Sequence, residues 1–215
     1  DVEGYDACRK IAILSSLAYG KFLNYEDVYT EGITKITTED MKYAKKLNMA
    51  IKLLASSKRV GDTFSVLVAP MLLSEEHPLC NVNDVFNAVF VRGNMLGDAM
   101  FYGSGAGKLP TASAVVADVV DAAKHLHRNV VTRWDAGELE LIPNAEAEHR
   151  FFVRVQGRSE AQKEQIREAF GSVEIVETEG LEDEFGFITE VMTEGTYSKK
   201  AEAFPEIIHM IRLAD

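Results

Sequence analysis

The stretch Asp1–Gly20, DVEGYDACRKIAILSSLAYG, decides how the rest of the chain is interpreted. It opens with turn-forming residues and continues from Ala7 to Tyr19 as a run in which nearly every position is apolar or small. Such a run predicts a helix that is buried on most of its sides. The charges lie in its first turns, where Asp6 and Lys10 are four residues apart and therefore share one face.

This carboxylate and this ammonium allow two interpretations. An ordinary ion pair at a helix start is the simpler one on the pattern alone, because structural ion pairs often occupy such places. The alternative is chemical. A buried lysine is easily shifted in pKa and can then act as an acid or a base, and a carboxylate one turn earlier would hold it in place.

The composition is that of a soluble globular protein, with 215 residues, 47% hydrophobic residues and 27% charged residues. The net charge of −11 argues against a nucleic-acid or anionic-membrane partner, which would need a basic face. No apolar run is long enough to span a membrane, and the first residues lack a signal-peptide pattern. Cys8 lies inside the predicted helix, and its spacing to Cys80 suggests no disulfide framework, so we expect a cytoplasmic protein.

The next part of the chain predicts a sheet with antiparallel neighbours and helices on one side. A strand at 51–55 and a longer one at 63–73 are joined by a turn at Gly61-Asp62, and Pro70 suggests an edge or a bend in the second. A helix starts at Thr37, which is a hydroxyl cap followed by acidic residues, and ends at Asn48. Residues 31–36 are expected to form a short strand or an extended segment, and further strands are expected at 87–95 and 98–102.

A glycine-rich stretch follows the last of these strands, with the sequence YGSGAGKLPTASAV over residues 102–115. The predicted helix 111–126 begins near Thr111 or Ser113, and its apolar stripe is expected to face the core. Exposed backbone N–H groups at such a junction can receive an anion or pack against a ring. On the pattern alone, a tight turn is the simpler interpretation, because the stretch lies far from any βαβ unit.

The remainder of the chain has its own order of elements. Residues 131–148 predict a linker that adds a strand at 138–142. Residues 149–215 predict β-α-β-β-α-β, the ferredoxin-like order, with a helix from Ser159 to Phe170 that is closed by Gly171.

Two motifs carry a family resemblance. The segment Gly4–Lys10, GYDACRK, resembles the helix start of the catalytic domain of homoserine dehydrogenases, D-x-x-G-x-D-A-x-x-K. Residues 102–118 resemble that family's second signature, Y-G-x-G-A-G-x-x-P-T-A-S-A-V-x-x-D. The resemblance implies an α+β protein in which a helix-covered mixed or antiparallel sheet is followed by a small ferredoxin-like domain similar to ACT regulatory domains. The expected parts are a catalytic, substrate-binding and dimerisation domain (1–130), the linker (131–148) and an ACT-like domain (149–215).

The resemblance also implies a reaction, the interconversion of L-homoserine and L-aspartate 4-semialdehyde with NAD(P)(H) in threonine, methionine and isoleucine biosynthesis. Lys10 would then be the proton shuttle, Asp6 would orient it and hold the substrate hydroxyl or a water, and Asp1 would bind the substrate ammonium. Gly107, and less directly Gly105, would approach the cofactor. No metal site is expected, since the five histidines are scattered.

Homoserine dehydrogenases begin with a nucleotide-binding Rossmann domain, which these residues do not include. We therefore expect these residues to be part of a longer enzyme that forms a homodimer. On their own, they are expected to be inactive and to bind no cofactor tightly. The competing hypothesis is a non-catalytic regulatory or dimerisation module with an amino-acid-sensing ACT-like half. The stretch Gly157–Glu160 lacks the Pro-Gly of amino-acid-binding ACT domains, so a dimerising role is at least as well supported as threonine feedback.

Overall fold

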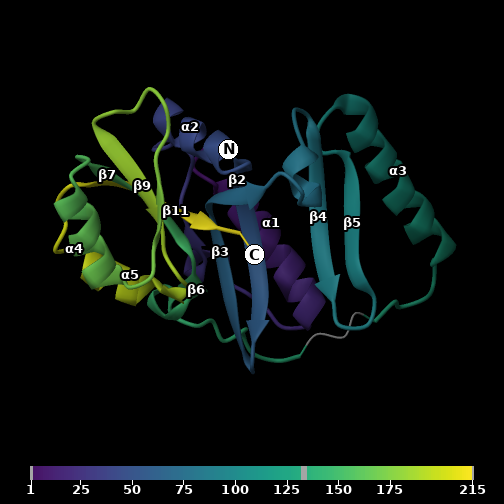
Figure 1. The fold of residues 1–215 in the computed structure, drawn as a ribbon. Coiled ribbons are helices and arrows are strands. Elements are labelled where there is room, and N and C mark those ends of the chain that lie inside the picture. Colours follow the sequence, from purple (N-terminus) through teal and green to yellow (C-terminus); the bar gives the residue numbers. More distant parts are fainter. Residues whose placement is uncertain (1, 132–134, 215) are drawn as a thin grey trace. The chain divides into compact units, whose positions relative to one another are not determined.

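The computed structural model describes residues 2–131 and 135–214, and the chain divides into two compact units (Figure 1). The first unit combines Asp1–Ser74 with Trp134–Asp215, and the second is Glu75–Arg133. The mixed α+β composition agrees with the predicted fold class.

A seven-stranded mixed sheet forms the frame of the first unit, in the order β1-β3-β11-β7-β9-β8, with β2 paired along the other edge of β3. The strands are β1 (Tyr29–Thr30), β2 (Met49–Val60), β3 (Thr63–Ser74), β7 (Phe151–Gln156), β8 (Glu174–Val176), β9 (Glu184–Ile188) and β11 (Ile207–Leu213); β6 (Glu148–His149) and β10 (Met192–Thr193) form a separate pair. The helices are α1 (Tyr5–Tyr19), α2 (Thr38–Lys46), α4 (Glu160–Phe170) and α5 (Glu194–Ala201).

Strand β3 lies inside the sheet and is not an edge strand. Pro70 lies at the point where the neighbour of β3 changes from β1 to β11. The carbonyls of Val68 and Leu72 accept hydrogen bonds of 2.8 Å from the N–H groups of Glu31 and Ala214, so both point toward the edge shared by β1 and β11. Pro70 alternates with them and faces the same edge. Its missing N–H therefore falls between the end of β1 and the start of β11, where the ladder needs no donor.

The C-terminal elements run in the predicted order, β7-α4-β8-β9-α5-β11, and pair antiparallel as β11-β7-β9-β8. The predicted ends of α4 are confirmed. Ser159 caps its start in a reciprocal capping box with Gln162, and Gly171 follows its last residue. Local signals of this kind act within a few residues, and for that reason they can be read from the sequence.

Strands from both sides of the predicted linker share one sheet, because β11 pairs in parallel with β3 through Arg212–Met71 and Leu213–Leu72. The linker itself contains isolated bridges instead of the strand predicted at 138–142, although Leu139 is buried in the core beneath α1. The division into 1–130, 131–148 and 149–215 stays a prediction, and the sheet shows that its outer parts are joined by backbone hydrogen bonds.

Helix α1 is less buried than predicted. Its buried positions are Cys8, Ala12, Ser15 and Ser16, which follow one narrow stripe against β2 and β3. The apolar side chains of Ile13, Leu14 and Leu17 are exposed, so the prediction of burial on most sides is wrong for this chain. An apolar run shows which residues avoid water, but it does not show what covers them.

The second unit consists of a hairpin, β4 (Phe86–Gly93) and β5 (Gly97–Ser104), and helix α3 (Lys108–Lys124). Helix α3 starts three residues earlier than predicted, after Gly107, and has no side-chain cap. All of α3 lies in the described part, and none of its residues is buried, so the predicted core-facing stripe is wrong here: Ala114, Val115, Val119 and Ala122 are exposed.

Candidate active site

The backbone turn before α1 fits tightly onto strands β1 and β3. Gly4 precedes the helix in a left-handed conformation (φ 80°), and its carbonyl accepts the N–H of Cys8 at 2.9 Å. A Cβ on Gly4 would lie 3.1 Å from the Thr30 methyl and 3.2 Å from a Val68 methyl. Glycine is therefore favoured at this position on two grounds, the left-handed backbone angle and the tight space.

Asp6 and Lys10 form the predicted pair on α1, with 2.7 Å between Oδ2 and Nζ. Their side chains are 56% and 62% exposed, so the expectation that burial prepares Lys10 for proton transfer is not met in this chain. The hydrogen bond from Lys10 lowers the pKa of Asp6 below its ordinary value. The pair is an exposed ion pair on the surface of the first unit.

The loop after β1 holds the turn before α1. Residues 31–36, predicted as a short strand or an extended segment, contain a bend and a turn and form no strand in the structure. Instead, the N–H of Ile33 donates to the carbonyl of Val2 at 2.8 Å. A Cβ on Gly32 would clash with the same carbonyl and would lie 2.6 Å from Cα of Glu3. This close approach of two backbones fixes where α1 begins.

Arg212 of β11 anchors that loop, and the sequence reasoning missed it. Its side chain is 2% exposed, and its guanidinium pairs with Glu194 of α5 through two hydrogen bonds and donates to Glu31 at 2.9 Å. Glu31 also accepts from the Tyr29 hydroxyl at 3.2 Å. Burial would lower the pKa of Arg212, but the hydrogen bonds to Glu194 and Glu31 outweigh it and raise that pKa. An arginine inside the apolar run Ile207–Leu213 was the available signal.

A second buried network joins α2 to the C-terminal strands. Arg154 of β7 donates to Asp40 at 2.9 Å, to Glu184 at 2.7 Å and to the Thr37 hydroxyl at 2.9 Å. His209 of β11 lies 3.0 Å from the other oxygen of Asp40. Burial opposes ionisation of Asp40, but the hydrogen bonds from His209 and Arg154 prevail and lower its pKa to about 2.

The glycine loop lies in the second unit. Gly107 has a φ of 123° and directly precedes α3, whose first N–H groups have no side-chain cap. A Cβ on Gly105 would collide with the Asn87 side chain. Bare backbone beside a helix N-terminus suits close approach by a planar ring or an anionic group, so these residues fit the nicotinamide cofactor that the family motif implies.

Among the described residues, the remaining predicted features add no further chemical group to this site. Asp1 lies outside the described residues. Across residues 2–131 and 135–214, no three potential ligands gather into a metal site, and no helix is long and apolar enough to cross a membrane. Cys8 and Cys80 are both free thiols, and Cys8 is buried as predicted.

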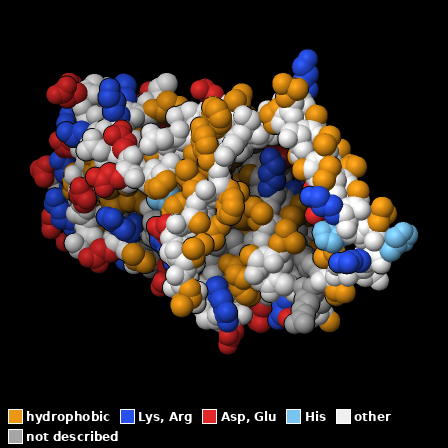
Figure 2. Space-filling view, turned by 90° about the vertical axis from the view of Figure 1, so that its right-hand side faces the viewer, with side chains coloured by type: hydrophobic (Ala, Val, Ile, Leu, Met, Phe, Trp, Pro, Cys, Tyr) orange, Lys and Arg blue, Asp and Glu red, His pale blue; other side chains and the backbone are white. Residues whose placement is uncertain are grey.

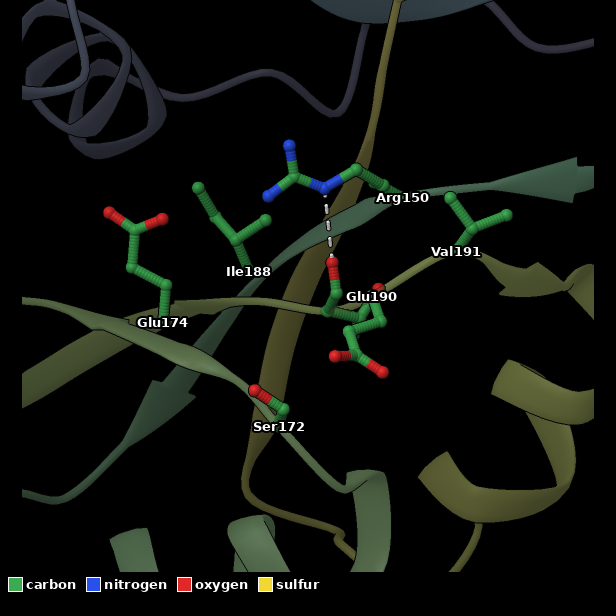
Figure 3. A pocket seen from close by; sticks show the side chains of 7 residues that line it. Arg150, Ser172, Glu174, Ile188, Glu190 and Val191 are labelled. Atoms are coloured by element: carbon green, nitrogen blue, oxygen red, sulfur yellow. Dashed lines mark hydrogen bonds between the residues drawn. The ribbon is translucent and has the colours of Figure 1, made fainter.

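A shallow cavity of about 390 Å³ opens beside the end of β9, and none of the predicted site residues lines it (Figure 3). Arg150 contributes the positive charge and donates through Nε to the carbonyl of Thr189 at 3.3 Å. In Figure 3 the carboxylate of Glu190 points away from the Arg150 guanidinium. Most of the lining side chains are exposed, and the cavity therefore lacks an enclosed set of converging polar groups.

Comparison with known proteins identifies the family. The sequence model of the family "Homoserine dehydrogenase" matches residues 1–120. The chain is 39% identical to homoserine dehydrogenase of Neisseria gonorrhoeae, with 74% of this chain and 39% of that protein covered. It is 36% identical to the Mycobacterium bovis enzyme, with 96% of this chain and 52% of that protein covered.

Solved structures agree with the sequence matches. A homoserine dehydrogenase from Thiobacillus denitrificans superposes with a TM-score of 0.88 at 31% identity, over all of this chain and 54% of that one. The S. aureus enzyme at pH 6.5 gives a TM-score of 0.79 at 28% identity, again over 54% of its length. The chain thus spans about half of these structures, and, with both motifs inside the matched segment, it belongs to the homoserine dehydrogenase family.

Proposed function

We propose that this chain supplies the substrate-binding and proton-transferring part of an NAD(P)-dependent homoserine dehydrogenase. The observation that carries the proposal is the Asp6–Lys10 pair, at 2.7 Å on an open face of α1, inside the segment that the family model matches. The reaction converts L-homoserine to L-aspartate 4-semialdehyde and is reversible.

Lys10 carries the proton in this proposal. Oxidation of the alcohol breaks an O–H and a C–H bond, and the neutral amine of Lys10 accepts the hydroxyl proton while hydride leaves the carbon. When bound, NAD(P)⁺ supplies the acceptor for that hydride. Asp6 holds the Lys10 amine and helps to position the hydroxyl, and Asp1 binds the substrate ammonium through opposite charge.

Water must be excluded for this chemistry, and the exposed faces of the chain suggest how. Removing water from around an ammonium favours its neutral form, which is the form that accepts a proton. The exposed apolar side chains Ile13, Leu14 and Leu17 lie on the same helix as Lys10. We propose that a nucleotide-binding Rossmann domain covers this face, and that Gly107 and Gly105 approach its cofactor.

The second unit supports a homodimer. Its hairpin and helix expose large apolar side chains, and Figure 2, which faces the side where α3 lies in Figure 1, shows many hydrophobic side chains at the surface. The exposed ones in this unit include Phe86, Val89, Phe101, Tyr102, Val115, Val116, Val119 and Val120. A surface so rich in exposed large apolar side chains is typical of a face that a partner covers.

The test is turnover by the enzyme that contains this chain. Homoserine-dependent formation of NAD(P)H is expected in the wild type. The Lys10→Ala variant is expected to lose at least about 100-fold in kcat, the usual contribution of a positioned acid–base group, with the cofactor KM nearly unchanged.

The matched control is Lys42→Ala, which removes an exposed lysine from α2 in the same unit. Its kcat should remain within about twofold of the wild type, since surface substitutions away from a site have small effects. Wild-type kcat in Lys10→Ala would exclude Lys10 as the proton carrier.

A regulatory or assembly module is the second candidate, favoured by the antiparallel order β11-β7-β9-β8 of the ferredoxin-like half. It predicts stable dimers of the isolated chain by light scattering and a rise in melting temperature with threonine, lysine or methionine. Amino-acid binding together with unchanged turnover in Lys10→Ala would favour this candidate over the catalytic one.

A further inference from the structure

We infer that Arg212, together with Glu31, is a positioning residue for the substrate end of α1. The inference rests on the proposed function, because it concerns the same Asp6–Lys10 site. It assigns a role to β11, which lies outside residues 1–120, the part that the family model matches.

The connection runs through three successive contacts. Arg212 is held from one side by Glu194, in two hydrogen bonds, so its guanidinium has a fixed plane. From the other side it donates to Glu31 at 2.9 Å. Two residues after Glu31, the N–H of Ile33 donates to the carbonyl of Val2. Val2 precedes the first turn of α1 by a few residues.

Burial makes the connection stiff. Arg212 is 2% exposed and the Glu31 side chain is 20% exposed, so water competes little for the pair. The backbone of Gly32 lies against Val2 and Glu3 too closely to admit a Cβ. A displacement of Glu31 must therefore move the turn before α1, and with it the direction of Asp6.

The chain contains a matched control for this argument. The Arg154–Glu184 pair is also buried, with side chains 4% and 10% exposed, and it also joins an arginine of the C-terminal half to a carboxylate. Its contacts lead to Asp40 and Thr37 at the start of α2 and not to the turn before α1. Breaking either pair should cost similar stability, but only one should disturb the substrate site.

The experiment compares Glu31→Gln with Glu184→Gln in the enzyme that contains this chain. Each variant keeps the side-chain size and removes one charge. Glu31→Gln is expected to raise the KM for homoserine about tenfold, since small misplacements of a binding group are costly, and to leave the cofactor KM within about twofold. Glu184→Gln is expected to lower the melting temperature about as much as Glu31→Gln does, and to leave the homoserine KM unchanged.

Hydrogen exchange gives a readout that does not depend on activity. The amide of Ile33 should exchange about tenfold faster in Glu31→Gln than in the wild type or in Glu184→Gln, because loss of a charged hydrogen bond loosens the loop. Unchanged exchange at Ile33 would overturn the inference. So would equal effects of the two variants on the homoserine KM, or faster exchange with an unaltered KM.

The two proposals can fail separately. If the wild-type enzyme does not oxidise homoserine, the proposed function fails, while exchange at Ile33 still shows whether Glu31 holds the turn. If the wild type is active and Glu31→Gln behaves like Glu184→Gln, the proposed function stands and the positioning role fails.

Discussion

At the scale of single residues, the start of α1 depends on two closely packed glycines. Gly32 permits two backbone segments to approach each other, and Gly4 supplies a left-handed turn against the methyl groups of Thr30 and Val68. Together they fix the direction of the helix that carries Asp6 and Lys10. The motif therefore has a structural meaning beyond its two charged residues. Its glycine sets the place of the pair, and the pair supplies the chemistry.

Replacement of Gly4 by alanine should destabilise the fold by about 2 kcal/mol, from the left-handed backbone and from pressure on Thr30 and Val68. The control is Gly20→Ala at the other end of α1, where φ is 71° and a Cβ would meet nothing within 4 Å. It should cost about 1 kcal/mol, from the backbone alone. Urea unfolding measures both, and equal losses would show that the contacts at Gly4 are unimportant.

At the scale of helices and strands, the sequence predicted what local chemistry specifies. The ends of α4 follow from Ser159 and Gly171, and the turn at Gly61-Asp62 follows from its residues. Strand β2 is longer than predicted. The prediction missed its second half because that half is polar and carries no apolar alternation. Helices α1 and α3 were predicted as helices, but the predictions of their burial were wrong. Burial depends on partners that periodicity does not identify.

The cap of α2 offers a test of how a local motif joins a larger network. Thr37 caps the helix in a capping box with Asp40 and also accepts from Arg154 at 2.9 Å. Thr37→Ala should cost about 2 kcal/mol, more than a cap alone, because a buried guanidinium also loses an acceptor.

Ser159→Ala is the control for this test, because Ser159 caps α4 in the same way without a contact to a buried ion pair. It should cost about 1 kcal/mol. Chemical denaturation of both variants gives the comparison, and a loss in Thr37→Ala no greater than in Ser159→Ala would argue against the network contribution.

At the scale of the first unit, two buried arginines join segments that are far apart in the sequence. Arg154 connects β7 to α2, and Arg212 connects β11 to the loop after β1. Neither connection was predicted, because a charged residue in a strand does not reveal its partner. The same limit applies to the pairing of β3 with β11, whereas the order of the C-terminal elements could be predicted from their individual patterns.

Stability should fall in acid through Asp40. Its pKa is about 2 in the folded protein and about 3.8 unfolded, so ionised Asp40 stabilises the fold above about pH 4, and this stabilisation is lost as the pH falls from 4 to 2. The difference corresponds to about 2 kcal/mol. Urea unfolding at pH 6 and pH 3 should show a smaller pH dependence in Asp40→Asn than in the wild type.

A direct measurement covers the case in which Asp40→Asn does not fold. The carboxyl carbon of Asp40 in the wild type, followed by NMR, should titrate well below the ordinary aspartate value of 3.8. Titration of Asp40 near 4 would contradict the account of its ion pairs.

The parallel pairing of β11 with β3 also has a consequence for biosynthesis. Strand β3 is synthesised long before β11. On the edge of β3 that faces away from β2, Met71 and Leu72 pair with Arg212 and Leu213. A nascent chain on the ribosome therefore holds one edge of β3 partly open until nearly all of these residues have emerged. Such high contact order slows folding and leaves an apolar strand available to chaperones during translation.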